Sequence, residues 1–591
     1  MKTNIMKKVI AAVLSASTVF SAACLSFGAF ASENGPDMII TEKIVGVSEY
    51  GYESYIMVDE NGNEVIDEPV ISTQGNADLP AAYDSREKGV ITCVKDQGRS
   101  GNCWAFASTS AMETSSVIEG IDTAEDADYS EAHLVWYTHN RRTEDEADRT
   151  HGDGTDVTTD PFLKGGNSKK AAATLARWSG MANEESFPFN GYQIDSMGNY
   201  GEENRYTTES GSIIKSWEKL QTESDVKQWI IENGSAVTSY YHHDGYLNFS
   251  NYAYYYPEEA DTSHAVTVVG WDDNYSASEF KNAPEGNGAW LCKNSWDSDW
   301  GNRGYFWISY YDASIGIFEG FTAMAAEDYY NNYTYNGSYW QTAYGVSGET
   351  QCANVFVADG YETLSAVSTV TAEPGISVKV TVYKNLPADY TTPVDGTQAA
   401  YTETYIANEG YHTIFLDEEI GLEPGEIFSV VLEEYNSSGV TFVPIERGET
   451  FTCKAGQSFL NYGTYKRGWK DSLNEGYGNL FIQAITKCAH HEHETVKIES
   501  TCAEAGREMT VCTQCGEISS EKMLPIGQHV YGGWSEYVSD GNGHETSTRS
   551  CVKCGDIQTK TFSEGNVVNL GDFLQMIFSR IMEIFRLSFK R

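Results

Sequence analysis

A glycine-rich turn that leads directly into a helical pattern is the feature that most constrains the fold of this chain. The segment reads Val94-Lys95-Asp96-Gln97-Gly98-Arg99-Ser100-Gly101-Asn102-Cys103-Trp104-Ala105-Phe106-Ala107. Asn102 is a good N-cap, and Trp104, Ala107 and Ala111 then recur at helical spacing. Cys103 is therefore expected in the first helical turn, where the helix dipole and unpaired N–H groups favour a thiolate over a thiol.

A glutamine on the other side of the turn adds to this pattern. Gln97 lies six residues before Cys103, so its side-chain amide can fold back and donate a hydrogen bond beside the sulfur. The alternative interpretation is a buried structural cysteine in a helix, which is the commoner fate of a lone cysteine.

A second region supplies the partners that a reactive cysteine needs. His264 enters the β-type run Ala265-Val266-Thr267-Val268-Val269, and Asn294 follows the run Ala289-Trp290-Leu291-Cys292-Lys293. A thiolate nucleophile pairs with a base, and the base needs an orienting hydrogen bond. A histidine at a strand edge is usually structural and an asparagine usually belongs to a turn, but the ordered set of Cys103, His264 and Asn294 is far more specific.

These motifs resemble those of the papain-like cysteine peptidases over residues 79–326. The resemblance also includes Leu79-Pro80-Ala81-Ala82-Tyr83-Asp84-Ser85-Arg86, Tyr129-Ser130-Glu131-Ala132-His133-Leu134 and Gly165-Gly166-Asn167. It implies an α+β catalytic domain with two lobes, one helical and one built from β-strands, and a peptide-binding cleft between them. It also implies a cysteine endopeptidase that needs no cofactor for its chemistry.

The resemblance implies a role for each matching residue. Cys103 is the expected nucleophile, His264 the general base and then acid, and Asn294 the group that orients the imidazole. Gln97 and the Cys103 N–H are expected to form the oxyanion hole. The residues expected around the bound peptide are Gly165 and Gly166, which would line the cleft, and Trp296, which would shield the His–Asn hydrogen bond.

Two departures from the family pattern lie close to these residues. Ser100 stands where the family often has a disulfide-bonded cysteine, so the cleft is expected to be held less rigidly. Asp297 replaces a usual glycine close after Asn294, which is expected to alter the local geometry.

The N-terminal segments indicate export and processing. Basic Lys2, Lys7 and Lys8, an apolar stretch and the ending Ala29-Phe30-Ala31 are typical of a signal peptide over residues 1–31. Residues 32–78 are expected to be a leader or short prosegment, with a clear strand pattern only near Tyr55-Ile56-Met57-Val58 and a second cut near Asn76 to Leu79. A secreted protein is expected, with cell-surface association as an option.

Residues 329–487 show short alternating runs that predict an all-β sandwich. Ile376, Val378, Val380 and Val382 share one face of a strand, and Pro-Gly turns precede this strand and the apolar run 427–431. The region loosely resembles lectin-like domains. Its aromatic residues could stack on sugar rings, but a core position is favoured for each of Tyr339, Trp340, Tyr344, Trp469 and Tyr477.

Residues 488–562 look like two degenerate copies of one small Cys/His-rich unit. One copy offers His490 or His493 with Cys502, Cys512 and Cys515, and the other offers His529, His544, Cys551 and Cys554. Each set can supply the four ligands of structural zinc, and disulfides are the alternative outside the cell. Residues 563–591 predict an amphipathic C-terminal helix, and each region after 326 is expected to bury its own core.

The charge of the chain limits its partners. The 591 residues carry a formal charge of −45, which argues against nucleic acid as a partner. The expected partner is a protein or peptide substrate, with a cell-envelope or glycan ligand as an option for the C-terminal regions. The alternative function is a surface adhesin or carbohydrate-binding protein that uses the papain-like domain mainly for binding.

Overall fold

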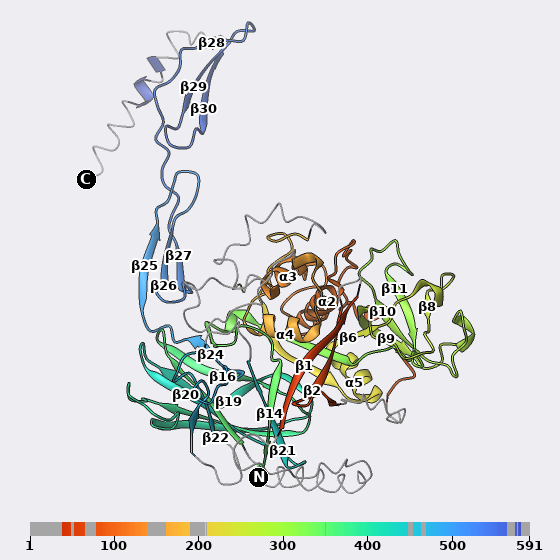
Figure 1. Ribbon diagram of the computed structural model, residues 1–591. Helices are drawn as coiled ribbons and strands as arrows, with labels where there is room; N and C mark the ends of the chain where they lie inside the picture. The colour runs from red at the N-terminus through yellow and green to blue at the C-terminus, as the bar shows by residue number, and fades with distance from the viewer. Residues whose placement is uncertain are drawn as a thin grey trace, which may run out of the picture. The chain divides into compact units, whose positions relative to one another are not determined.

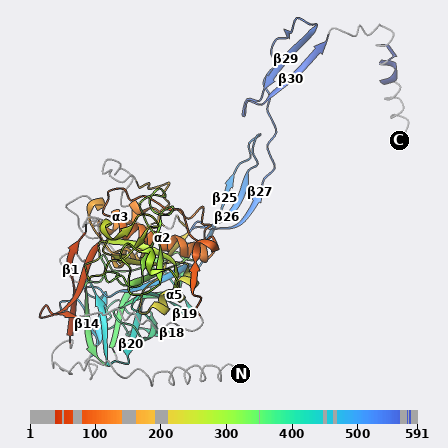
Figure 2. The same cartoon turned by 90° about the vertical axis from the view of Figure 1, so that its right-hand side faces the viewer.

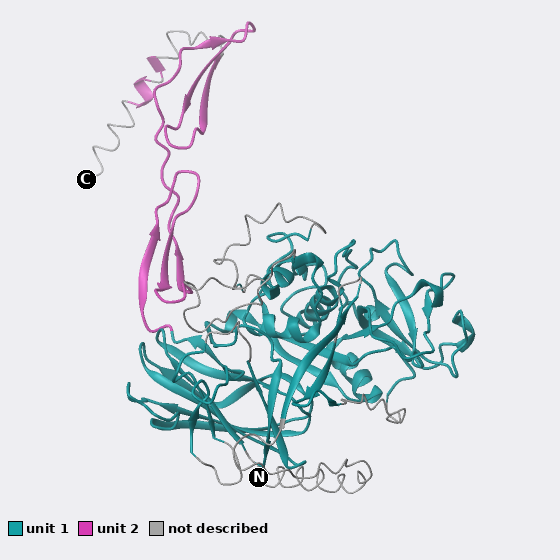
Figure 3. Cartoon of the chain, in the orientation of Figure 1, with its two compact units in different colours: residues 1–489 teal, residues 490–591 magenta. Residues whose placement is uncertain are grey.

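The computed structural model describes most of the chain as two compact units, residues 1–489 and residues 490–591 (Figure 3). The described residues are 38–48, 52–65, 79–139, 161–189, 207, 210–348, 350–446, 453–461, 468–563, 574–575 and 577–580. The predicted signal peptide lies outside them. Of the predicted C-terminal helix, residues 574–575 and 577–580 are described and are helical.

The helical lobe of the first unit is built around a buried central helix (Figure 1). Its α-helices are α2 (Cys103–Ile118), α3 (Glu131–His139) and α4 (Ser168–Ala176). Because nearly every side chain of α2 is buried, this helix has no wide polar face and packs on all sides. The short 3₁₀ helices of the unit are η1 (Ser85–Lys88), η2 (Pro161–Leu163), η5 (Asp244–Tyr246), η6 (Ala277–Glu279) and η7 (Ala326–Asp328).

The β lobe is one part of a long, mostly antiparallel sheet, and helix α5 (Glu223–Asn233) contacts several of its strands. The strands run in the order β5 (Ser212–Leu220), β12 (Phe318–Ala325), β6 (Ala236–Tyr240), β9 (His264–Asp272), β10 (Ala289–Lys293), β11 (Tyr305–Ser309), β8 (Ala253–Tyr254) and β7 (Leu247–Asn248), and β4 (Ala82–Asp84) pairs with β9. A large aromatic core that includes Trp271, Trp290 and Phe306 fills this lobe.

The region after residue 329 is a β-sandwich, as the alternating pattern predicts. One of its sheets has the order β18 (Thr397–Ile406), β17 (Ile376–Lys384), β20 (Ile427–Asn436), β15 (Thr350–Val357), β22 (Ser458–Asn461) and β23 (Lys470–Asp471). The predicted inward residues of β17, Ile376, Val378, Val380 and Val382, are all buried. The predicted core positions of Tyr339, Trp340 and Tyr344 are confirmed, since each is buried, and Trp469 and Tyr477 are half-buried.

The sandwich is not separate from the peptidase-like part, so the expectation that each later region buries only its own core is wrong here. The long sheet continues from β5 into β19 (Gly410–Leu422), β16 (Glu362–Thr371), β24 (Ile482–Cys488) and β13 (Asn331–Tyr333). Trp217 of β5 also packs edge-on against Trp340, with 5.3 Å between ring centroids. Both tryptophans belong to the core that contains Cys103.

The leader contributes strands to a further sheet, with the order β21 (Val440–Ile445), β14 (Thr342–Ser347), β1 (Met38–Val47), β2 (Glu53–Asp59) and β3 (Glu64–Val65). The strand predicted near Tyr55 is therefore confirmed as β2. Strand β1 was not predicted, and it pairs antiparallel with β14, about 300 residues away in the sequence (Figure 2). The leader is thus part of the folded first unit.

The second unit contains two small antiparallel sheets of similar design. They are formed by β25 (His493–Ile498), β26 (Arg507–Cys512) and β27 (Ile518–Met523), and by β28 (Val538–Ser539), β29 (His544–Ser550) and β30 (Ile557–Ser563). Across the described part of the chain, the helices are too short or too polar to cross a membrane.

Candidate active site

Cys103 is the first residue of α2 and is fully buried. The predicted position at the helix start is therefore confirmed, although the Asn102 side chain makes no capping hydrogen bond. The backbone N–H of Ala265 donates a hydrogen bond to the Cys103 sulfur over 3.4 Å. This bond ties the start of α2 to the start of β9, so Cys103 lies next to the residue that follows His264.

Strands β9 and β10 bring His264 and Asn294 together. His264 begins β9, Asn294 directly follows β10, and the two strands pair antiparallel. His264 Nε2 and Asn294 Oδ1 lie 2.8 Å apart, which makes Nε2 the protonated nitrogen of a neutral ring and leaves Nδ1 without that proton. Trp296 stacks on the imidazole at 4.5 Å between centroids, so it covers this hydrogen bond as the resemblance implies.

Gln97 lies close to the same loop, but its amide is already engaged. Its Nε2 donates to the Ser100 carbonyl at 2.9 Å, and its Oε1 accepts from the Ser295 hydroxyl at 2.6 Å. The Gln97 N–H also donates to the Ser295 carbonyl. These bonds fix the glycine-rich turn and the Gln97 side chain against the segment that follows Asn294.

Burial favours the uncharged forms of both central groups. Burial raises the pKa of the Cys103 thiol to about 12, although the Ala265 N–H works in the opposite direction. Burial also lowers the pKa of His264 to about 3, although the hydrogen bond that His264 donates to Asn294 raises it, and nearby His242 lowers it further. Burial at this site therefore favours a thiol at Cys103 and a neutral imidazole at His264.

The two predicted cleft glycines precede α4, and one of them has no room for a side chain. A Cβ on Gly166 would lie 2.4 Å from the Trp104 ring, so only glycine fits there. Leader residue Tyr52 forms a parallel bridge with Gly166, and the Glu53 N–H donates to the Gly166 carbonyl at 2.9 Å. The leader therefore pairs with the loop that was predicted to bind peptide.

The leader also contacts the opposite side of this site. The Ser48 hydroxyl donates to the Ser263 carbonyl, directly before His264. Two buried ion pairs hold the leader to α4, Glu42 with Lys169 and Glu53 with Lys170. These contacts could not be predicted from the sequence, because each joins residues more than 100 positions apart.

A buried charge cluster behind the site was also missed. Lys95 contacts Glu113 at 2.8 Å, Asp128 at 2.8 Å and Glu131 at 3.1 Å. Lys293, the neighbour of Asn294, donates to the Thr92 and Ser110 hydroxyls at 3.0 Å each. The sequence signal for this cluster was Lys293, which ends an otherwise apolar strand pattern, because a buried lysine requires polar partners.

The structure rearranges the predicted metal-ligand sets. Side chains that can bind a metal converge in two groups, Cys488, His490, Cys512 and Cys515, and Cys502, His529, Cys551 and Cys554. Cys502 therefore belongs with the second copy rather than the first, while His493 and His544 stay outside both groups and are exposed. The predicted sets change because each Cys-x-x-Cys pair lies in a hairpin turn and is close to a cysteine from an earlier segment.

Comparisons with known proteins match two regions of the chain to family models. Residues 79–324 match the family model described as papain family cysteine protease, and residues 332–486 match the model described as lectin like domain. The chain therefore carries a papain-family cysteine protease domain followed by a lectin-like domain.

Relatives of the chain include cysteine proteases, and a solved structure with a similar fold contains both a protease and a lectin-like domain. Over 263 residues, the chain is 29% identical to a cysteine protease of Blomia tropicalis, covering 43% of this chain and 68% of that protein. It is 28% identical to human cathepsin L2 over 39% of this chain and 61% of that protein. The solved cysteine protease and lectin-like domains of Cwp84, a surface layer associated protein of Clostridium difficile, share 21% identity and a TM-score of 0.60, covering 78% of this chain and all of that one.

A second structure, the clostridial cysteine protease Cwp84 after propeptide cleavage, gives a TM-score of 0.57 at 24% identity over 69% of this chain and 99% of that chain. These two similarities indicate that the peptidase and lectin-like parts of this chain share their fold with those structures.

Proposed function

We propose that this protein is a secreted cysteine endopeptidase in which Cys103 attacks the peptide carbonyl. The observation that carries this proposal is the convergence of three segments, with the Ala265 N–H on the Cys103 sulfur and His264 bound to Asn294. His264 Nε2 is engaged by Asn294, and in this proposal Nδ1 takes the thiol proton. This pairing generates the thiolate nucleophile.

The proposed reaction has two stages. The Cys103 sulfur forms a bond to the carbonyl carbon, and the negative oxygen is stabilised by the Cys103 N–H and by Gln97 once its amide turns toward it. His264 then gives its proton to the leaving amine, and a thioacyl-enzyme remains. Water, activated by His264, hydrolyses this thioester and releases the second product.

Leader residues 32–78 act as a prosegment in this proposal. Tyr52 and Glu53 pair with Gly166, and Ser48 bonds to Ser263, so the leader spans both sides of the site where a peptide would lie. Removal of the leader would open the site to solvent and to substrate. The cut expected near Asn76 to Leu79 can be checked by N-terminal sequencing of secreted, active protein.

The alternative is a surface adhesin or carbohydrate-binding protein, which the lectin-like match favours. A cell-envelope or glycan ligand for that domain, and a place at the cell surface, fit the peptidase proposal as well. Tyr339, Trp340 and Tyr344 are buried and do not offer a sugar-stacking surface.

An active-site label separates the two functions. We expect an epoxide-bearing peptide to modify Cys103 of the leader-free protein stoichiometrically, and to leave half-exposed Cys453 unmodified. Labelling that is equal at both cysteines, or absent from Cys103 in folded leader-free protein, would favour the binding-protein alternative.

A further inference from the structure

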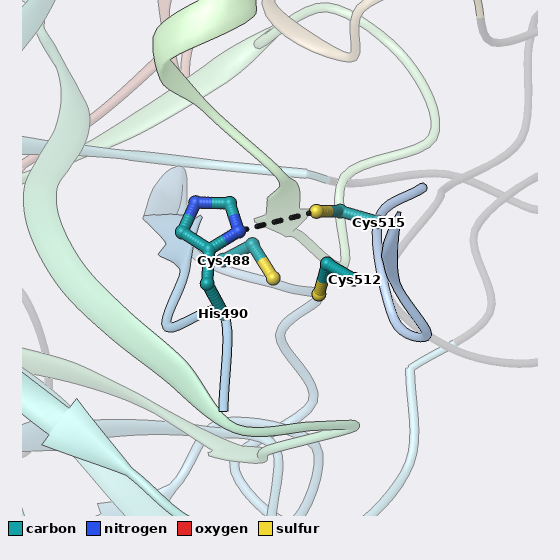
Figure 4. Close-up of side chains that lie close together, drawn as sticks. All are labelled: Cys488, His490, Cys512 and Cys515. Atoms are coloured by element: carbon teal, nitrogen blue, oxygen red, sulfur yellow. Dashed lines mark hydrogen bonds between the residues drawn. The ribbon is translucent and has the colours of Figure 1, made fainter. Parts of the chain in front are cut away.

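Two groups of side chains that could bind a metal share no residue with the peptidase site. The first consists of Cys488, at the end of β24, with His490, Cys512 and Cys515, and Figure 4 shows these side chains converging. The second consists of Cys502, His529, Cys551 and Cys554. In each group, the ligand atoms all lie within 4.8 Å of one another. Each group therefore presents three sulfurs and one imidazole nitrogen to one point.

The two groups repeat the same construction. The histidine and the paired cysteines of the second group each follow their counterparts by 39 residues. His490 Nδ1 lies 3.4 Å from Cys515 Sγ, and His529 Nδ1 lies 3.4 Å from Cys554 Sγ. The same distance between the same atoms in both copies indicates one ligand geometry used twice.

The cysteine pairs lie in identical turns. The first pair joins β26 to β27, and the second joins β29 to β30. A glycine with positive φ follows each pair, Gly516 at 80° and Gly555 at 77°, and its N–H donates to the carbonyl of the first cysteine at 2.9 Å. This backbone points both sulfurs of a pair to the same side, as a metal requires.

The sulfur geometry favours a metal over disulfides. Cys502 Sγ and Cys551 Sγ lie 3.5 Å apart, whereas a disulfide bond is about 2 Å long. A tetrahedral zinc ion at ordinary bond lengths holds two sulfurs about 3.8 Å apart and a sulfur and a nitrogen about 3.6 Å apart. Three cysteines per group also cannot all pair within the group, while one zinc ion uses all three and the histidine.

Apart from these two groups, residues 490–563 contain few buried side chains that could stabilise their fold. Residues 490–563 are all described, and their buried side chains are Cys502, Cys512, Cys551 and Ser547. Every residue of β27 is exposed. Small domains without an apolar core commonly depend on a bound metal, and here the candidate ligands occupy the place of that core.

We propose that each group binds one structural Zn²⁺ through three cysteine thiolates and one histidine Nδ1, and that these two ions hold the region after residue 488 in its folded form. Binding of each ion releases the thiol protons, and no oxidation is involved.

Metal content of the full-length protein tests the proposal. The protein carries Cys103→Ala throughout, which removes the reactive thiol from the metal count and prevents self-cleavage. After reduction, exposure to Zn²⁺ and desalting, we expect two zinc ions per chain by elemental mass spectrometry. Cys554→Ser and Cys515→Ser should each lower the count to one, and Cys453→Ser, a cysteine outside both groups, should leave it at two.

Histidine variants test the ligand assignment. His529→Ala should lower the count toward one, and His529→Cys, which restores a fourth ligand, should return it to two. His493→Ala and His544→Ala should leave two ions in place. With Co²⁺ as the probe, the absorption of tetrahedral cobalt–thiolate centres should appear and fall by about half in Cys554→Ser.

Three results would overturn the proposal. The first is no zinc in the reduced protein after exposure. The second is a zinc count that the cysteine variants do not change, which means adventitious binding. The third is an intact mass of the purified, unreduced protein that is lower by two hydrogens per cysteine pair within residues 488–562, which means disulfides.

Discussion

At the level of single residues, the leader-covered site holds Cys103 and His264 in their uncharged forms. Burial raises the pKa of Cys103 to about 12 and lowers that of His264 to about 3. A catalytic ion pair needs the opposite forms, thiolate and imidazolium. Release of the leader, by admitting water, would therefore favour charge at both groups at once.

This burial makes the covered protein sensitive to acid. An exposed histidine takes up a proton near pH 6.5, but folded His264 does so only near pH 3, so its contribution to stability is present above pH 6.5 and is lost as the pH falls. Between pH 6.5 and pH 5 this loss is about 2 kcal/mol.

The pH effect can be measured by thermal melting of the Cys103→Ala protein with its leader attached. We expect the drop in Tm between pH 7 and pH 5 to be smaller when His264→Ala is added. Burial raises the pKa of Glu319 to about 7, so protonation of Glu319 stabilises the folded protein as the pH falls. This effect is present in both proteins, and the difference between their drops in Tm therefore reports on His264. An equal drop in both proteins would contradict the assignment.

The buried Lys95 cluster gives a second prediction at this scale. Glu113 accepts hydrogen bonds from Lys95 and from the Thr92 hydroxyl and the Tyr129 N–H. Glu113→Gln should lower the free energy of unfolding by about 3 kcal/mol, because it leaves the buried lysine with less compensating charge. Glu119→Gln, at an exposed position six residues after Glu113, should change it by less than about 0.5 kcal/mol in denaturant melts. Similar effects for both variants would show that the cluster is not stabilising.

Sequence patterns predicted the residues of the site better than the contacts they make. Cys103, His264 and Asn294 come together as the ordered motifs indicate. The engagement of Gln97 with Ser100 and Ser295 was not predictable, because it depends on how the glycine-rich turn packs against a loop nearly 200 residues away. Asp297 adopts a φ of 67°, so the backbone keeps a conformation that favours glycine, and its carboxylate accepts the Ser298 and Asp299 N–H groups.

At the level of elements, alternation predicted the strands that have one buried face. It identified β17 and β2 but missed β1, whose pairing partner β14 lies far along the sequence. The Cys-x-x-Cys turns were visible in sequence, whereas the third cysteine of each group comes from a preceding segment. No spacing rule could therefore assign Cys488 and Cys502 to their groups.

The leader strands yield a prediction about activation. Lys170 and Glu53 form an ion pair in which both side chains are buried, and Glu53 also donates its N–H to Gly166. Lys170→Gln should weaken leader binding and raise the rate at which an epoxide peptide labels Cys103 in leader-containing protein by about tenfold or more, since a broken buried pair costs several kcal/mol. Glu60→Gln, an exposed leader position, is the matched control and should leave the rate unchanged. A labelling rate for Lys170→Gln equal to that of the control would show that this ion pair does not hold the leader.

At the level of the whole first unit, the papain-family and lectin-like parts are continuous. Strand β5 pairs with β19 across the boundary, and Trp217, Trp340, Tyr411 and Phe481 share one core with Cys103. Sequence composition changes sharply near residue 326, which suggested separate folding. This change in composition could not reveal that strand β5 of the peptidase part hydrogen-bonds to strand β19 of the lectin-like part.

This continuity predicts the fate of a truncated chain. A protein that ends at residue 326 exposes the Trp217 face of β5 and removes β14, the partner of leader strand β1. We expect it to be insoluble or to melt at least about 10 °C below a protein that ends at residue 489, as judged by circular dichroism. A soluble 326-residue protein with an unchanged Tm would contradict the shared core.

The central claim is that Cys103, held by Ala265 and paired with His264, performs peptide hydrolysis. The most direct measurement is the rate at which leader-free protein cleaves a quenched fluorescent peptide, with and without Cys103→Ala. We expect the rate of Cys103→Ala to fall to the uncatalysed background while its Tm stays within about 2 °C of the parent, and we expect Cys453→Ser to keep the full rate. Undiminished cleavage by folded Cys103→Ala protein would contradict it.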